Sequence, residues 1–112
     1  MKTLGDEWTA FTGEKMVYAV WCVRRDYAAN FPEIVHKVGQ AFQHSMKMSA
    51  KHIDHIAEEA ARWDIFSKDF LKEYFITLKF EFGAEYQQGF QRYLKEANRL
   101  GAIDGVPELE FF

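Results

Sequence analysis

Three side chains that could ligate a metal ion lie close together in the middle of the sequence. His52, His55 and Glu59 are spaced three and four residues apart, so a helix would place them on one face. Imidazole and carboxylate groups in that arrangement suit a divalent ion such as zinc or nickel. The alternative is an ordinary solvated helix face, because Lys51 and Asp54 lie in the same stretch. A His-Glu-x-x-His motif, which would add a general base, does not occur. We therefore expect no metal site.

Two further groups could take part in chemistry near residue 24. Arg24 and Arg25 follow an apolar run, and paired guanidinium groups at the end of a strand could bind a carboxylate. We favour the simpler interpretation that they are exposed charges. Cys22, the single cysteine, lies inside the apolar run, which argues against a Cys–His nucleophile and excludes a disulfide framework. No residue is therefore assigned as catalytic from these patterns, and no cofactor is expected.

Composition narrows the class of protein. The chain has 112 residues with 48% apolar, 17% aromatic and 28% charged residues, which is typical of a folded protein and not of a disordered one. Its net charge of −3 argues against a partner bound through a phosphate backbone. It has neither an apolar run of the ~20 residues that cross a membrane nor the hydrophobic stretch of a signal peptide. We expect a cytoplasmic protein with no nucleic-acid or membrane partner.

The elements that would position these side chains are mostly helices. Apolar residues recur at spacings of three and four along most of the chain. The exception is residues 16–23, where every residue is apolar or aromatic, and this predicts a strand buried on both faces. We interpret residues 1–112 as one unit, with a short helix over 1–13, the strand over 16–23, and helices over 31–48, 51–63, 67–77 and 84–100.

Local signals refine this interpretation. Ser67 is expected to cap the helix that follows it, and Gly101 to end the last helix. Gly89 lies within the apolar stripe of that last helix, which predicts the close approach of another backbone. Residues 76–82 alternate apolar and polar residues, and fit either a second strand or a frayed helix end.

A strand buried on both faces needs neighbours, because its N–H and C=O groups must be paired away from water. The sequence offers at most the half-polar residues 78–82 as a second strand. Three outcomes are open: pairing with the same strand of another copy, completion by a missing polypeptide, or a segment that begins a buried helix instead. The fold class we predict is mainly α with one N-terminal β-strand, completed by strand pairing between chains.

Several stretches then show a resemblance to a known family. The first is Leu4-Gly5-Asp6-Glu7-Trp8, with Thr12-Gly13 leading into residues 16–21. Others are residues 74–83, Gly89-Phe90-Gln91-Arg92-Tyr93, and Gly101-Ala102-Ile103 with Pro107-Glu108-Leu109. In order and spacing they resemble the C-terminal part of chorismate dehydratase, an enzyme of the futalosine route of menaquinone biosynthesis. One departure is Glu14-Lys15, where the family carries a Leu-Pro pair.

The resemblance implies a fragment of a two-lobe α/β fold like that of type II periplasmic solute-binding proteins, with residues 16–23 as a crossing strand. It implies dehydration of chorismate to 3-(1-carboxyvinyloxy)benzoate without a metal or organic cofactor. It also implies that the N-terminal lobe, which carries most of the substrate contacts, is missing, so the isolated chain is expected to be inactive. Tyr18 and Trp21 are the residues expected to bind the carboxylate substrate, with Trp8 a weaker candidate.

The expected partners are a second copy of the chain, in a homo-oligomer, or the missing N-terminal lobe. Three alternative functions stay open. The chain could be a non-catalytic solute-binding module, a helical oligomerising module, or a segment of the sister enzyme that forms dihydroxynaphthoate.

Overall fold

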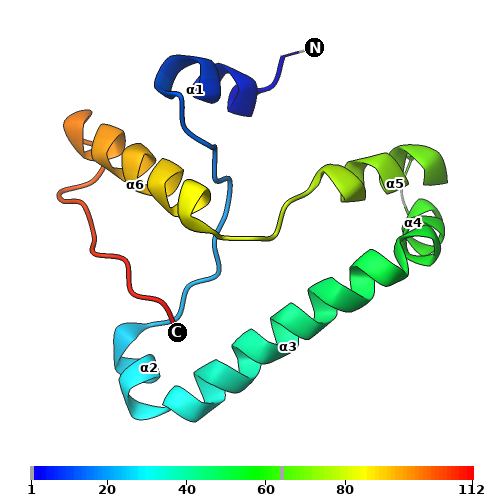
Figure 1. Ribbon diagram of the computed structural model, residues 1–112, viewed down its shortest axis with the longest axis horizontal. Helices are drawn as coiled ribbons and strands as arrows, with labels where there is room; N and C mark the ends of the chain where they lie inside the picture. Colours follow the sequence, from blue (N-terminus) through cyan, green and yellow to red (C-terminus); the bar gives the residue numbers. More distant parts are fainter. Residues whose placement is uncertain (1, 64) are drawn as a thin grey trace. The chain divides into compact units, whose positions relative to one another are not determined.

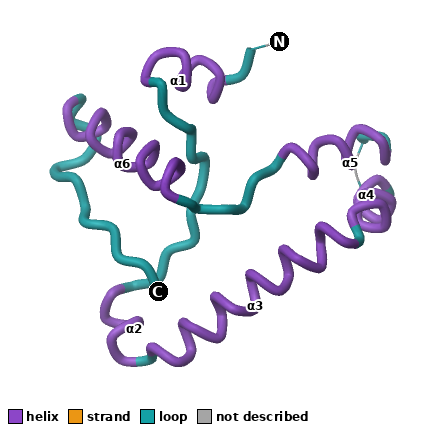
Figure 2. Tube along the Cα trace, viewed as in Figure 1, coloured by secondary structure: helices purple, strands orange, loops and turns teal. Residues whose placement is uncertain are grey.

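The computed structural model describes residues 2–63 and 65–112, and these residues form helices joined by loops (Figures 1 and 2). The helices are α1 (Leu4–Thr12), α2 (Arg25–Asn30), α3 (Pro32–Lys51), α4 (Ile53–Ala61), α5 (Lys68–Thr77) and α6 (Ala84–Arg99).

Side-chain and glycine caps fix several helix ends. α1 begins with a capping box in which the Asp6 N–H donates to Thr3 Oγ1 at 3.1 Å and the Thr3 N–H donates to Asp6 Oδ2 at 2.8 Å. The backbone hydrogen bond from Thr3 holds the pKa of Asp6 below its usual value. Ser67 accepts a hydrogen bond from the Phe70 N–H at 3.3 Å, and Gly101 follows α6 with a φ of 75°. The predictions that these two residues are caps are confirmed.

The chain divides into two compact units. One contains α1 with the segment up to Cys22, and Glu81–Phe111 with α6. In this unit the Phe82 ring contacts the rings of Phe90 and Phe111, with both centroid distances at 5.9 Å. Asn98 Nδ2 donates to the Ile103 carbonyl at 3.0 Å, which ties the end of α6 to the segment after it.

The other unit consists of Val23–Phe80 with Phe112, and it contains α2, α3, α4 and α5. α4 and α5 pack against each other (Figure 1), and Ala57 and Leu71, one from each helix, are 0% and 6% exposed. Two ion pairs join the same helices: Lys68 Nζ to Glu58 Oε2 at 3.0 Å and Lys72 Nζ to Asp54 Oδ1 at 2.7 Å.

These ion pairs shift the titration of their members. The hydrogen bond from Lys72 lowers the pKa of Asp54, and the hydrogen bond from Lys68 lowers the pKa of Glu58. The bond to Glu58 in turn raises the pKa of Lys68. All of these groups are exposed, so the pairs fix the relative placement of α4 and α5 more than they stabilise the fold.

The predicted strand and the predicted α/β fold are wrong. Residues 15–24 form a loop segment between α1 and α2, and no described residue belongs to a strand (Figure 2). Tyr18, Val20 and Trp21 are exposed and not buried on both faces. Without a neighbouring strand the segment has no ladder of hydrogen bonds to hold it as one. The other strand candidate, residues 78–82, is a loop after α5, so the described chain has no sheet that could form a lobe.

Candidate functional site

The two residues expected to contact substrate lie on residues 15–22, the part of this loop that belongs to the unit of α1 and α6, which we call the aromatic segment. Tyr18 is 70% exposed and Trp21 is 85% exposed. Both large rings are therefore presented at the surface, where they could lie against a flat, partly apolar ligand. The chemistry of the site depends on how firmly the rest of the unit holds this segment.

The start of the aromatic segment is fixed against α6. Gly89 is buried, and a Cβ built on it would overlap the carbonyl oxygen of Lys15 and lie 3.0 Å from the Lys15 carbonyl carbon. Gln88 Nε2 donates to Glu14 Oε1 at 2.8 Å beside this contact. The predicted close approach at Gly89 is thus confirmed, and it is the backbone of Lys15 that approaches.

A second glycine positions Tyr18. A Cβ added to Gly5 of α1 would overlap the Tyr18 hydroxyl and lie 3.3 Å from Tyr18 Cζ and 3.6 Å from Met16 Cβ. The edge of the Tyr18 ring therefore lies on α1 at the point where the helix lacks a side chain. Gly5 and Gly89 together hold the segment at two places, Tyr18 and Lys15.

Trp8, the weaker candidate, helps to pack α1 against α6 and is half-buried. Its ring lies edge-on to Tyr93 at 5.6 Å and is tilted against Phe11 at 6.5 Å. Its Nε1 is a buried donor for which the described residues provide no acceptor. Trp8 thus packs α1 against α6, whereas Tyr18 and Trp21 are exposed.

Lys15 is the functional candidate that the sequence interpretation missed. Its backbone is held by α6, its side chain is exposed, and it lies three residues before Tyr18. An ammonium group near an aromatic surface suits a carboxylate attached to a ring. The signal was present in the sequence as the departure Glu14-Lys15 from the Leu-Pro pair of the family it resembles.

The arginine pair belongs to the other unit and has a structural role there. Arg24 Nε and an Arg24 terminal nitrogen donate to the two carboxylate oxygens of Asp26 at 3.0 and 2.7 Å. This bidentate pair closes the first turn of α2, of which Arg25 is the first residue. The guanidinium of Arg24 is therefore already engaged by a carboxylate of its own chain.

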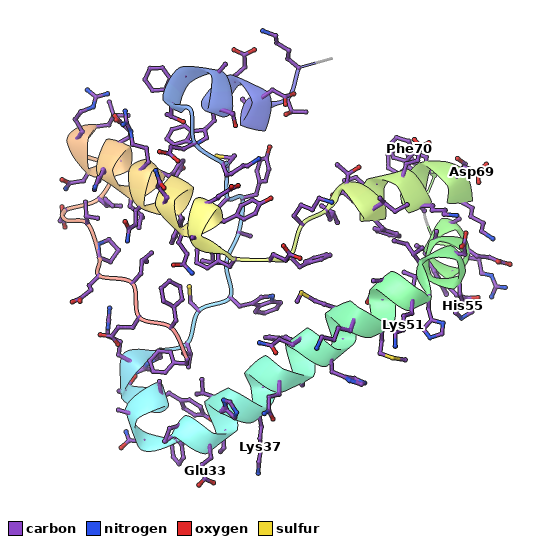
Figure 3. The ribbon with its side chains drawn as sticks, viewed as in Figure 1. Glu33, Lys37, Lys51, His55, Asp69 and Phe70 are labelled. Atoms are coloured by element: carbon purple, nitrogen blue, oxygen red, sulfur yellow. The ribbon has the colours of Figure 1, made fainter. Side chains whose placement is uncertain are left out.

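The possible metal ligands are not brought together. His52 lies at the boundary between α3 and α4, so it does not share one continuous helix with His55 and Glu59. Glu59 pairs with Arg62 at 2.9 Å, and His55 lies on α4 (Figure 3). Among the described residues no three His, Cys, Asp or Glu side chains form a group that could hold a metal ion.

These observations define a helical protein with an anchored aromatic surface segment. None of the helices formed by the described residues is both long and apolar enough to cross a membrane.

A comparison with known families identifies the family to which the chain belongs. The family described as menaquinone biosynthesis matches residues 1–99. The chain belongs to this menaquinone biosynthesis family, and its role lies in menaquinone biosynthesis.

Proposed function

We propose that the aromatic segment of this chain is a substrate-binding surface for the dehydration of chorismate in menaquinone biosynthesis. The observation that carries this proposal is the aromatic segment, on which Tyr18 rests against Gly5 while Trp21 is 85% exposed. Family membership supports the pathway, and the resemblance to chorismate dehydratase supports the substrate.

The reaction determines which contacts this surface would make with the substrate. Chorismate loses its ring hydroxyl and a ring hydrogen as one molecule of water, and the ring becomes aromatic in 3-(1-carboxyvinyloxy)benzoate. Tyr18 and Trp21 would contact the ring face, which is flatter in the product than in the substrate. Lys15 would pair with a carboxylate. These contacts would orient the ring of chorismate, and they would not remove the ring hydrogen, which leaves as a proton.

The proton must be removed by a base that this chain does not supply in our proposal. The carboxylates of Asp54 and Glu58 are paired with lysines, and their lowered pKa values make them weaker bases. Neither lies in the unit that contains Tyr18. Because the resemblance implies that most of the substrate contacts lie on an N-terminal lobe, we expect the isolated chain to bind chorismate and not to dehydrate it.

Tryptophan fluorescence tests the binding step. Chorismate added to the chain should quench the emission of Trp21, and Trp21→Phe should remove most of this change. Trp63→Phe is the matched control, because Trp63 is 90% exposed and belongs to the other unit. Trp21→Ala should weaken binding at least tenfold by calorimetry. An affinity that is equal in Trp21→Ala and Trp63→Ala would contradict the proposal.

The absorbance of chorismate tests the second step. A constant absorbance in the presence of the chain is the expected result. A fall in absorbance that depends on chain concentration would show that the chain does carry a base, and would overturn the assignment of a binding role alone. If a futalosine derivative binds more tightly than chorismate, the sister enzyme that forms dihydroxynaphthoate is the better assignment.

A further inference from the structure

Residues 14 and 15 are held in place by contacts with both α1 and α6. Thr9 Oγ1 donates to the Glu14 carbonyl at 3.0 Å, and the Glu14 N–H donates to Thr12 Oγ1 at 3.1 Å. The carbonyl group of Lys15 lies against Gly89. The backbone of both residues is therefore fixed within one unit, and the two charged side chains extend from a fixed position.

The carboxylate of Glu14 has a partner on α6. Gln88 Nε2 donates to Glu14 Oε1 at 2.8 Å, a contact between residues that are 74 positions apart in the sequence. Glu14 is half-buried, whereas Gln88 is exposed. A hydrogen bond to an ionised acceptor is shorter and stronger than one between neutral groups. Gln88 thus holds the Glu14 carboxylate at α6.

The ammonium group of Lys15 does not pair with the carboxylate beside it in the sequence. Lys15 is exposed and directly follows Glu14. Its flexible four-carbon stem would let the ammonium group reach that carboxylate if Gln88 did not bind it. Among the ion pairs of the described residues, none joins Lys15 to Glu14.

We propose that Gln88 is a positioning residue of the chorismate site, because by binding the Glu14 carboxylate it leaves the Lys15 ammonium group available for a carboxylate of the substrate. This inference rests on the proposed function, in which Lys15 pairs with a carboxylate while Tyr18 and Trp21 contact the ring. Gln88 itself does not touch the substrate. Its amide suits the role, since it donates to Glu14 without adding a second positive charge. The site should therefore select ring compounds that carry a carboxylate.

Calorimetric titration with chorismate at low ionic strength tests the role of Gln88. Gln88→Leu releases the Glu14 carboxylate, which should compete for Lys15 and weaken chorismate binding by about two- to fivefold, the effect expected of an exposed ion pair. Glu14→Gln added to this variant removes the competing charge and should restore the affinity. Gln91→Leu is the matched control, because Gln91 is also exposed on α6 and is not the partner of Glu14, and it should leave the affinity unchanged.

A Lys15→Gln background separates this role from a purely structural one. If Gln88 acts through Lys15, Gln88→Leu should cause no further loss of affinity once the ammonium group is absent. The dimethyl ester of chorismate is the matched ligand, since it keeps the ring and has no carboxylate charge, and Gln88→Leu should not change its affinity. A loss that persists in the Lys15→Gln background, or that extends to the ester, would overturn the inference, because Gln88 would then support only the fold.

The NMR signal of the Lys15 ε-methylene group gives a readout that needs no chorismate. Gln88→Leu should shift this signal, because the Glu14 carboxylate moves to the ammonium group, and adding Glu14→Gln should reverse the shift. A signal that does not move would overturn the inference even if the parent chain binds chorismate. A parent chain that does not bind chorismate would contradict the proposed function, and the inference with it.

Discussion

Gly89 of α6 lies directly against the backbone of Lys15, at a distance that leaves no room for a Cβ atom. This contact joins two parts of the chain that are far apart in sequence and fixes where the aromatic segment begins. A glycine inside a helix lowers helix propensity, but at position 89 it also permits the backbone of Lys15 to pack closely against α6.

Gly89→Ala should destabilise the unit that contains α6. The new methyl group would meet a carbonyl oxygen of the backbone, which cannot turn aside as a side chain can. Overpacking of this kind costs about 1–3 kcal/mol, and the gain in helix propensity offsets up to ~1 kcal/mol of it. Urea unfolding of the variant measures the difference.

Gly39→Ala is the control for this experiment. Gly39 also lies inside a helix, but a Cβ there would have nothing within 4 Å. The control should increase stability by up to ~1 kcal/mol. If the two variants changed the free energy of unfolding in the same direction, the contact between Gly89 and Lys15 would not restrict α6.

For Gly5→Ala, in contrast to Gly89→Ala, the gain in helix propensity should exceed the steric cost of the new Cβ. Its Cβ would meet the hydroxyl of Tyr18, which is the far end of a side chain that is 70% exposed and can swing away. We expect α1 to gain up to ~1 kcal/mol in stability while chorismate affinity falls, because Tyr18 no longer rests on α1. Adding Tyr18→Phe removes the clashing hydroxyl and should restore part of the affinity. No change in affinity in Gly5→Ala would mean that the position of Tyr18 is irrelevant to binding.

The ion pairs between α4 and α5 predict a dependence of stability on pH. Asp54 and Glu58 have pKa values below their ordinary 3.8 and 4.5 in the folded chain. Their contribution is therefore complete above these ordinary values and is lost as the pH falls through the lower, folded pKa values. For Lys68 the sign is reversed, since its pKa lies above the ordinary 10.5 and its contribution is lost only as the pH rises through that higher value.

Thermal unfolding between neutral and acid pH measures this effect. The double variant Lys68→Gln and Lys72→Gln should show a smaller fall in unfolding temperature, because it lacks both partners. Added salt should reduce the difference, since the pairs are exposed. An identical fall in the double variant and the parent chain would show that these pairs do not contribute.

The sequence predicted local features better than it predicted the fold. Ser67, Gly89 and Gly101 act as their residue types and positions indicated, because capping and close approach depend on a few neighbouring residues. The strand prediction is wrong because an all-apolar run does not by itself require burial on both faces. In the structure Trp21 and Tyr18 are exposed, and a run without a neighbouring strand has no ladder to form.

Other features could not be derived from the sequence. α2 was not predicted, since its six residues hold only Tyr27 and two alanines as apolar residues and show no repeat. The periodicity of α3 identifies its apolar face but not what covers it. Of the candidate site, Tyr18 and Trp21 came from a resemblance and Lys15 from the structure. Their joint contact with chorismate is still a proposal.

Mapping of backbone amide shifts by NMR, with chorismate added to the isotope-labelled chain, tests the proposed site most directly. The largest shifts should fall on residues 15–21 and on the parts of α1 and α6 around Gly5 and Gly89, with small shifts in α4 and α5. The largest shifts in α4 or α5, or no shifts at concentrations where chorismate is in large excess, would contradict the proposed site.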